Sequence, residues 1–261
     1  MKRLFYLAIA LVMVFALVAC SSSADHLEEI KKDGKLEVGT SADYPPFEYV
    51  DEAGKTTGFD VELMEEVGKR MGVTVVWVDM PFDSLIAAVQ GGKIDTAIAA
   101  FNYDAERDKT VDFTDEYYTT EDSLVVLETL SGDMPTPENL DQFIVGVQSG
   151  TVQDSWLTDN FEATGKLTAD TLFRYERVDQ AFMDLQAGRV QVIMADYVAA
   201  KALVEKFGGM KIVYQGVLST GPLNIVVPEG DTSLREEINR IIAQLREEGF
   251  ILQLSVKYFS E

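Results

Sequence analysis

Segments whose hydrophobic and polar positions suit a buried strand alternate along the chain with segments that have the helical period. This pattern predicts a succession of strands and helices. The segments 36–40, 73–78 and 93–100 have the apolar character of buried strands. Between them lie apolar stripes with the helical period, the first closed by Gly72 and the second begun by Asp83. Strands that alternate with helices are typical of a parallel sheet covered on both faces.

The second half of the chain repeats this alternation with different residues. Strands are predicted at 143–147 and 190–195, and an amphipathic helix over 178–185 lies between them. The chain ends in two predicted helices, at 233–248 and 250–259. The two halves share this pattern without a detectable sequence repeat, which indicates an α/β protein with two lobes.

Aromatic and polar side chains follow the predicted strands of the first half. Tyr44, Phe82 and Asn102 lie at the carboxyl ends of these strands. Open parallel sheets bind their ligands at this edge. The three positions are therefore candidates for a binding site.

Arg107 stands close behind the third of these strands, in a helical turn that Asp104 can cap. Backbone N–H groups at the start of such a turn, beside a guanidinium, form a site for a carboxylate or another small anion. The alternative is that Arg107 only pairs with Glu106 or Asp108 on a solvated turn. The stretch alone leaves both possibilities open.

The second half offers a similar anion-binding turn and an acidic residue. Gln148, Ser149 and Gly150 form a turn after the strand 143–147, and Thr151 begins a helix predicted to extend to Phe161. Asp196 follows the strand 190–195 directly. It either contributes to a site at this edge or only caps the helix that follows.

The amino terminus has the pattern of a secretory signal. Lys2 and Arg3 precede an apolar run over 4–19, which is short for a membrane span. The run ends at Cys20, and the segment 17–20 is similar to a bacterial lipobox, in which the cysteine becomes the lipidated first residue. The alternative is an ordinary signal peptide with a chance cysteine. Because Cys20 is the only cysteine, it cannot form an intrachain disulfide bond.

Charge and composition narrow the class of protein. Removing Lys2 and Arg3 with the signal leaves 20 basic against 44 acidic residues, a net charge of about −24. This balance repels nucleic acid and anionic lipid head groups. The single histidine, His26, stands next to the amino-terminal tether, so mechanisms that need a histidine base or ligand in a cleft are not supported.

Several short motifs, taken in their order and spacing, resemble the family 3 extracellular solute-binding proteins of ABC transporters, the polar amino acid receptors. The likeness covers nearly the whole mature chain. It rests on GTSADYPPF (39–47), GFDV (58–61), FDSL (82–85), GKID (92–95), ER (106–107) with VDFT (111–114) and YY (117–118), VGVQSGT (145–151), and AGR (187–189) before Asp196.

The resemblance implies a two-lobed periplasmic-binding-protein type II fold, in which each lobe is a mostly parallel sheet flanked by helices. Two hinge crossings then fall near 123–127 and 216–226, and the C-terminal helices return to the first lobe. The expected segments are a signal peptide at 1–19, the lipidated cysteine and tether at 20–25, a first lobe at 26–123 plus 221–261, and a second lobe at 124–220.

The resemblance also implies a role for each candidate residue. Arg107 would bind the α-carboxylate of an amino acid, helped by the N–H groups of Asn102 and Thr151. Asp196 would bind the α-ammonium, and Ala100 would offer backbone contacts. Tyr44 and Phe82 would enclose the ligand's side chain. No catalytic residue, metal site or cofactor is implied.

The side chain of the ligand stays open at this stage. Ser41 stands where receptors for basic amino acids often carry an acid, Asp43 and Asp79 offer compensating charges, and Gln148 suits a polar side chain. The implied partners are an amino acid, an ABC permease and, through Cys20, the outer face of the cell membrane, with the receptor acting as a monomer. Two further classes remain: an enzyme similar to the secreted cyclohexadienyl or arogenate dehydratases, and a ligand-sensing module.

Overall fold

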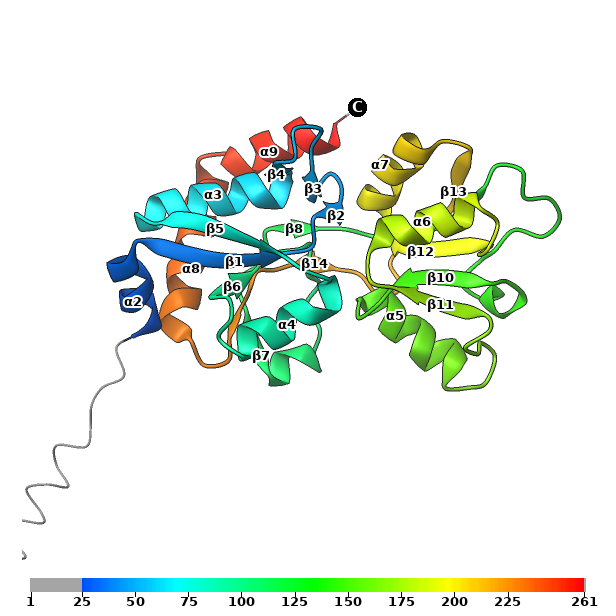
Figure 1. Ribbon diagram of the computed structural model, residues 1–261, viewed down its shortest axis with the longest axis horizontal. Coiled ribbons are helices and arrows are strands. Elements are labelled where there is room, and N and C mark those ends of the chain that lie inside the picture. Colours follow the sequence, from blue (N-terminus) through cyan, green and yellow to red (C-terminus); the bar gives the residue numbers. More distant parts are fainter. Residues whose placement is uncertain (1–24, 261) are drawn as a thin grey trace, which may run out of the picture.

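The computed structural model describes residues 25–260, and within this range most strands belong to two five-stranded sheets that lie one after the other along the molecule (Figure 1). The predicted signal peptide, Cys20 and most of the tether lie outside the described residues. No described helix combines the length and the hydropathy needed to cross a bilayer.

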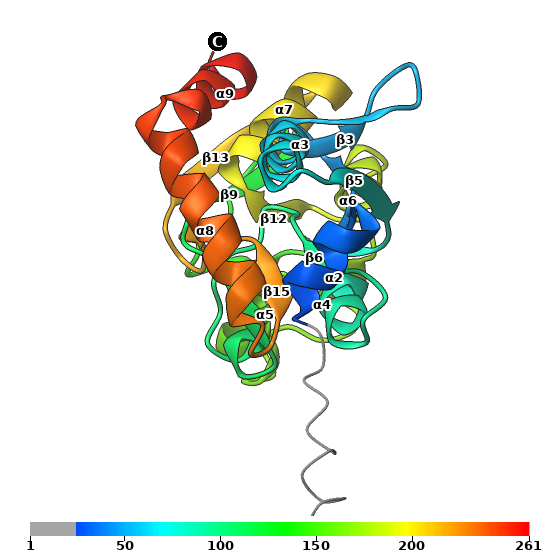
Figure 2. The ribbon, with the colours of Figure 1, turned by 90° about the vertical axis from the view of Figure 1, so that its left-hand side faces the viewer.

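The first sheet combines strands from both ends of the described chain. Its strands are β1 (Lys35–Thr40), β5 (Thr74–Asp79), β6 (Thr96–Ala97), β7 (Val111–Phe113) and β15 (Val226–Pro228), in the order β5-β1-β6-β15-β7. β1 runs parallel to both neighbours, and β15 runs antiparallel to β6 and β7. The helices of this lobe are α2 (His26–Asp33), α3 (Phe59–Met71), α4 (Phe82–Gln90), α8 (Thr232–Glu247) and α9 (Phe250–Phe259). Seen end-on in Figure 2, α2 and α8 lie together at the outer end of this lobe.

The second sheet belongs to the middle of the chain. Its strands are β9 (Asp122–Leu127), β10 (Val145–Gln148), β11 (Leu172–Tyr175), β12 (Val192–Asp196) and β13 (Met210–Gly216), in the order β11-β10-β12-β9-β13. β10 runs parallel to β11 and β12, and β9 pairs antiparallel with β12 and β13. Figure 1 shows α5 (Val152–Leu157) on one face and α6 (Val178–Gln186) and α7 (Tyr197–Phe207) on the other. Both lobes are therefore mixed α/β, with largely parallel sheets.

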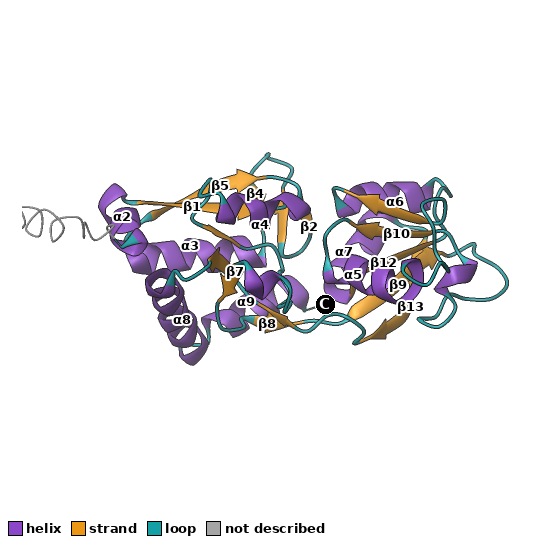
Figure 3. Cartoon of the chain, turned by 90° about the horizontal axis from the view of Figure 1, so that it is seen from below, coloured by secondary structure: helices purple, strands orange, loops and turns teal. Residues whose placement is uncertain are grey.

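The chain passes between the lobes twice, and the two passages are tied to each other. β8 (Tyr118–Thr119) pairs antiparallel with β14 (Pro222–Leu223), and Figure 3 shows β8 at the edge where the chain crosses. Asp122, at the start of β9, then accepts hydrogen bonds from the N–H groups of Leu218, Ser219 and Thr220 at 2.7–3.1 Å. This buried carboxylate joins the outgoing and the returning crossing.

A small sheet at the inner end of the first lobe faces the second lobe. It consists of β2 (Asp43–Tyr44), β3 (Glu48–Val50) and β4 (Thr56–Thr57), and β2 packs against α6. In the β2–β3 pair, Tyr44 stands directly opposite Glu48 and Asp43 opposite Tyr49. Because directly paired residues share a face of the sheet and successive residues alternate, Tyr44 and Glu48 lie on one face and Asp43 on the other.

Candidate functional site

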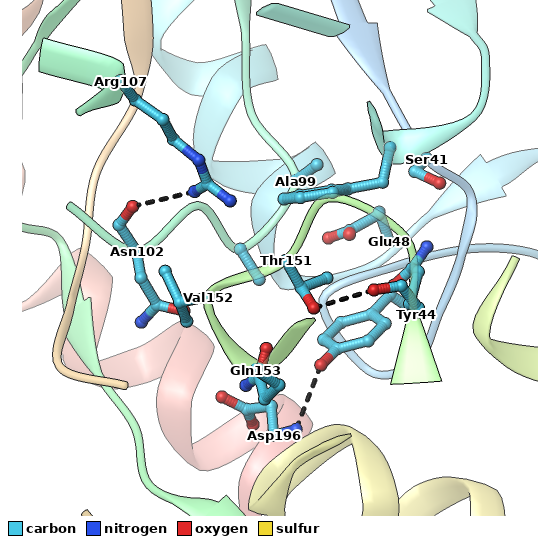
Figure 4. Close-up of a pocket in the computed structure, with 13 residues that line it drawn as sticks. Ser41, Tyr44, Glu48, Ala99, Asn102, Arg107, Thr151, Val152, Gln153 and Asp196 are labelled. Atoms are coloured by element: carbon cyan, nitrogen blue, oxygen red, sulfur yellow. Dashed lines mark hydrogen bonds between the residues drawn. The ribbon is translucent and has the colours of Figure 1, made fainter. Parts of the chain in front are cut away.

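A small enclosed cavity lies between the two lobes, at the carboxyl ends of their central strands (Figure 4). Its volume of about 20 Å³ is room for about one water molecule. An amino acid therefore requires the lobes to move apart or wall side chains to rotate. The cavity is lined by Ser41, Tyr44, Glu48, Phe82, Ala99, Ala100, Asn102, Arg107, Gln148, Thr151, Val152, Gln153 and Asp196.

Arg107 reaches the cavity from the turn that Asp104 caps. Asp104 Oδ1 accepts from the N–H of Arg107 at 2.9 Å, and the turn continues as a short 3₁₀ helix. The guanidinium donates to the Asn102 carbonyl at 3.2 Å in its own lobe and to the Gly150 carbonyl at 2.5 Å across the cleft. Burial lowers its pKa. Its side-chain hydrogen bonds are made to carbonyl oxygens, not to Glu106 or Asp108, so a partly buried positive charge faces the cleft.

The rings around Arg107 hold its side chain over the cavity. Phe82, at the start of α4, packs against Phe101 with ring centroids 4.6 Å apart. The guanidinium lies 5.6 Å from the Phe82 centroid and 5.8 Å from that of Phe101, within the range of a cation–π interaction. These contacts restrict the guanidinium, so part of the ordering that ligand binding requires is already present.

The second lobe presents the turn at Gly150 and the amino end of α5. Thr151 caps α5 by accepting from the N–H of Asp154 at 3.2 Å, and its hydroxyl donates to the Gln148 carbonyl at 2.9 Å. Gly150 has a φ of +75°, and a Cβ there would lie 2.9 Å from the Cβ of Asp83 in the opposite lobe. This position therefore takes glycine both for its backbone conformation and for the close approach of the lobes.

Asp196 ends β12 and caps α7 while it lines the cavity. Its Oδ1 accepts from the N–H groups of Val198 and Ala199 at 2.9 and 3.5 Å. Its own N–H donates to the hydroxyl of Tyr44 across the cleft at 3.2 Å (Figure 4). Burial raises the pKa of the Asp196 carboxyl to about 7. Capping and cavity lining, which the sequence left as alternatives, are thus both present.

Of the three predicted positions Ser41, Asp43 and Asp79, only Ser41, which lies between β1 and β2, lines the cavity. Asp43 and Asp79 instead meet Arg177, at the end of the second lobe that faces them. Arg177 donates from both terminal nitrogens to Asp79, at 2.8 and 3.1 Å, and Asp43 Oδ2 accepts from the N–H of Val178 at 2.5 Å. These two carboxylates therefore hold the lobes together beside the cavity.

Four lining residues were not predicted as binding residues: Glu48, Ala99, Val152 and Gln153. Glu48 is 1% exposed, and burial raises the pKa of its carboxyl well above the ordinary value. It lies beside Asp60, whose pKa burial raises to about 6. Gln153 belongs to the first turn of α5, and the glycine-containing turn before it directs this end of the helix at the cleft. Its position just after that turn could have identified it as a cavity residue from the sequence.

Ala100 lines the cavity in a backbone conformation that is uncommon for a residue with a side chain. Its φ is 46°, in the left-handed region. Its N–H donates to Asp60 Oδ2 at 2.8 Å, and Tyr117 donates to the same oxygen at 2.8 Å. A buried carboxylate therefore fixes the backbone of the cavity wall. Within residues 25–260, no cluster of three histidine, cysteine or acidic residues is arranged to hold a metal ion.

Comparisons with known proteins agree on one family. The model of the bacterial extracellular solute-binding proteins, family 3, matches residues 36–261. The L-cystine-binding protein TcyJ of Escherichia coli (strain K12) is 30% identical over 253 residues, 95% of this chain and 93% of that protein. The histidine-binding periplasmic protein of the same strain is 30% identical over 267 residues, 99% of this chain and 97% of that protein.

Solved structures give the same picture. A mutant of ArgBP from T. maritima superposes with a TM-score of 0.84 at 37% identity, covering 90% of this chain and 99% of that one. An ancestral amino acid-binding protein, described as a precursor of cyclohexadienyl dehydratase, superposes with a TM-score of 0.79 at 31% identity and the same coverage. The two-lobed fold expected from the sequence is therefore confirmed.

Proposed function

The chain belongs to the bacterial extracellular solute-binding proteins of family 3, and we propose that it captures an L-amino acid between its lobes and delivers it to an ABC permease. The observation that carries this proposal is the pair of opposite charges in one interlobe cavity. Arg107 comes from the first lobe and Asp196 from the second. An α-amino acid is a zwitterion, so one charged group of the site meets each of its ends.

The proposed contacts involve three parts of the ligand: its α-carboxylate, its α-ammonium and its side chain. The α-carboxylate accepts from the guanidinium of Arg107 and from the N–H groups of Asn102 and Thr151. The α-ammonium donates to Asp196 and to the carbonyl of Ala100. Tyr44 and Phe82 enclose the ligand's side chain, whose far end is met by the polar residues Ser41, Gln148, Glu48 and Gln153.

Binding by these groups needs no chemical step. Micromolar affinity corresponds to about −8 kcal/mol. Charge-assisted hydrogen bonds contribute about 1.5–3 kcal/mol each, so three or four of them offset the cost of ordering the ligand and closing the lobes. A ligand that touches both lobes stabilises the closed form, and a permease that recognises this form distinguishes the loaded receptor from the empty one. We further propose that Cys20 carries the lipid that holds the receptor, as a monomer, at the outer face of the cell membrane.

Catalysis is the second candidate, because one observation favours it. A dehydratase on this fold needs a cavity acid that stays protonated near neutral pH, and the pKa of Glu48 is raised by burial. The relatives named above are binding proteins, and the pair Arg107 and Asp196 suits an amino acid. We therefore place the receptor function first.

A thermal-shift screen of the purified protein against the common L-amino acids, prephenate and arogenate tests both candidates. The receptor proposal predicts a rise in the melting temperature with one or a few amino acids, because a ligand that binds only the folded state stabilises it. A shift with prephenate or arogenate alone, followed by product formation, would establish the enzyme instead.

Substitution of Arg107 tests the assignment of the site. Arg107→Ala should weaken amino acid binding by roughly a hundredfold or more, since it removes the charged partner of the carboxylate inside the cleft. The fold should persist, because the side chain lies at the cavity and not inside either core. Arg189→Ala is a matched control, since Arg189 pairs with Asp184 on the surface of the second lobe. Unchanged affinity in Arg107→Ala would rule out the proposed site.

A further inference from the structure

Asp60, in the first turn of α3, is a fully buried carboxylate that holds two separate parts of the first lobe. Its Oδ2 accepts from the N–H of Ala100 and from the hydroxyl of Tyr117, both at 2.8 Å. Ala100 lines the cavity, whereas Tyr117 directly precedes β8, the crossing that leaves this lobe. Asp60 itself is not among the residues that line the cavity, although it adjoins the lining residue Glu48. It can therefore act on a ligand only through its neighbours.

The returning crossing fixes the other side of the same wall. The N–H of Asn224 donates to the carbonyl of Phe101 at 2.8 Å, and Asn102 pairs with Leu223 in an antiparallel bridge. Leu223 also accepts from the N–H of Tyr117 at 2.9 Å. The cavity wall and both crossings thus close a ring of hydrogen bonds through the Asp60 carboxylate. If that carboxylate is lost, the backbone after Ala100 stays attached to the returning crossing, and Ala100 is the wall residue that is released.

Ala100 is also the wall residue whose conformation is costly. Its φ of 46° lies in the left-handed region, which an alanine populates roughly tenfold less readily than the right-handed one. Strained backbone of this kind persists where the surrounding structure holds it, and it is concentrated at ligand sites. The hydrogen bond to Asp60 is such a hold. The carbonyl of Ala100 and the N–H of Asn102, both assigned to the ligand above, depend on it for their direction.

We propose that Asp60 is a positioning residue for ligand binding, because its hydrogen bond to the N–H of Ala100 keeps the wall in the conformation that meets both charged ends of the amino acid. The inference rests on the proposed function and adds to it a residue that lies behind the cavity wall. A carboxylate with a purely structural role stabilises the lobe and leaves the affinity of the folded protein unchanged. A positioning role makes the affinity itself depend on the acceptor oxygen.

Isothermal titration calorimetry of the unaltered protein with each of the twenty common L-amino acids selects the tightest one as the probe. Asp60→Leu removes both acceptor oxygens with little change in size. It should weaken binding of the probe by roughly tenfold, the factor by which alanine disfavours the left-handed conformation. Asp60→Asn keeps an amide oxygen that accepts from both donors, so it should restore most of the affinity. Each titration is made at a temperature at which the variant is folded, as measured by circular dichroism.

Ala100→Gly separates positioning from stability. Glycine adopts a positive φ without the cost that alanine has, so a glycine wall needs the hydrogen bond from Asp60 less. Asp60→Leu should therefore weaken probe binding much less when it is combined with Ala100→Gly than when it is made alone. If Asp60→Leu alone does not fold, a double variant that folds and binds the probe supports the inference in the same way. A double variant that stays unfolded would overturn it, because the role of Asp60 would then not act through Ala100.

Asp95→Leu is the matched control. Asp95 also accepts from a backbone N–H, that of Glu37 at 2.7 Å, but it lies at the amino end of β6, away from the cavity. Its loss should lower the melting temperature and leave the affinity for the probe unchanged. Equal losses of affinity from Asp60→Leu with alanine and with glycine at position 100, or no loss in either, would overturn the inference and leave the receptor function standing. Binding of none of the twenty amino acids to the unaltered protein would overturn both.

Discussion

At the scale of single residues, Asp196 combines a structural and a binding role, and these roles have opposite consequences for stability. The carboxylate caps α7, which a neutral asparagine does about as well. Burial raises its pKa from 3.8 to about 7, so the folded state holds this proton more tightly than the unfolded state. The contribution to stability is therefore fully present below about pH 4 and is lost as the pH rises through 7.

Asp196→Asn should for this reason raise the melting temperature of the ligand-free protein at pH 8 by a few degrees, while it abolishes amino acid binding. The unaltered protein should also lose affinity for amino acids as the pH falls below 7, because a protonated carboxyl cannot pair with an ammonium group. Calorimetry and thermal melts at pH 5.5 and pH 8 measure both effects. A variant that is destabilised at pH 8 and still binds would contradict the assignment.

The residues of the cavity differ in how far the sequence could reveal them. Arg107, Tyr44, Phe82 and Asp196 stand next to turns at the carboxyl ends of strands, so local sequence places them at one edge of a sheet. Glu48 follows two prolines and a phenylalanine, and its direction depends on the register of β2 with β3, which a loop of that kind does not fix. In the structure this register places Glu48 in the cavity wall and the next residue of β3 on the opposite face of the strand.

The alternation of side chains along a strand also explains why Asp43 does not line the cavity. Asp43 and Tyr44 are adjacent in sequence, so they point to opposite faces of β2. Tyr44 therefore lines the cavity while Asp43 reaches Ser41 and the backbone of α6, at 2.7 and 2.5 Å. Sequence alone names both as candidates because it does not show where the second lobe lies.

At the scale of elements, strongly periodic segments are predictable and irregular ones are not. The stripes of α3, α6 and α8 match the predicted helices closely. The predicted strand 93–100 keeps only Thr96–Ala97 in β6, because the chain then turns at Ala100, which a buried carboxylate holds in the left-handed region. That turn depends on a contact with Asp60, forty residues away in sequence, so no local sequence pattern predicts it.

The helix predicted from 151 to 161 is interrupted for a similar reason. It is an α-helix only as far as Leu157 and continues as a wider π-helical turn over Thr158–Glu162. Arg174 of β11 donates to Asp154, Thr158 and Glu162 along this segment. β11 itself was not predicted, since its alternation is short and two of its four residues are exposed.

His26, the first residue of α2, is one of the side chains that attach this helix to the rest of the first lobe. His26 Nδ1 lies 2.5 Å from Asp231, which caps α8, and Nε2 lies 3.0 Å from Asp95, before β6. Hydrogen bonds to Asp231 and then to Asp95 raise the pKa of His26 from 6.5 to about 10. Because the folded state binds this proton more tightly, the contribution to stability is full below about pH 6.5 and is lost as the pH rises towards 10.

His26→Ala should lower the melting temperature by a few degrees at pH 6.5, and the difference from the unaltered protein should shrink steadily up to pH 9.5. Thermal melts across this range measure it. Lys31→Ala is the matched control, because Lys31 joins the same helix to α8 through Glu237 without a histidine. Its difference should stay level between pH 6.5 and 9. If the difference in melting temperature between His26→Ala and the unaltered protein grew with pH, His26 would not act through ion pairs with Asp231 and Asp95.

At the scale of the whole molecule, closure of the lobes depends on contacts that no ligand makes. Arg177 comes from the second lobe and pairs with Asp79 through two hydrogen bonds, and it lies 3.4 Å from Asp43. The side chain of Asp79 is 44% exposed, so this pair is partly screened by solvent. Exposed ion pairs contribute about 0–1 kcal/mol, which is small against folding but large enough to shift an equilibrium between open and closed forms.

Arg177→Ala should therefore leave the melting temperature of the ligand-free protein nearly unchanged. It should weaken ligand binding by roughly three- to fivefold, through faster dissociation of the ligand. Removal of a contact worth less than about 1 kcal/mol favours the open form by that factor. Small-angle scattering should show a larger mean radius without ligand, and stopped-flow kinetics should show the change in the dissociation rate. Arg174→Ala is the matched control, since Arg174 pairs with Asp154 and Glu162 inside the second lobe and its loss should act on stability instead. Equal effects of the two substitutions on dissociation would mean that Arg177 stabilises its own lobe and has no part in closure.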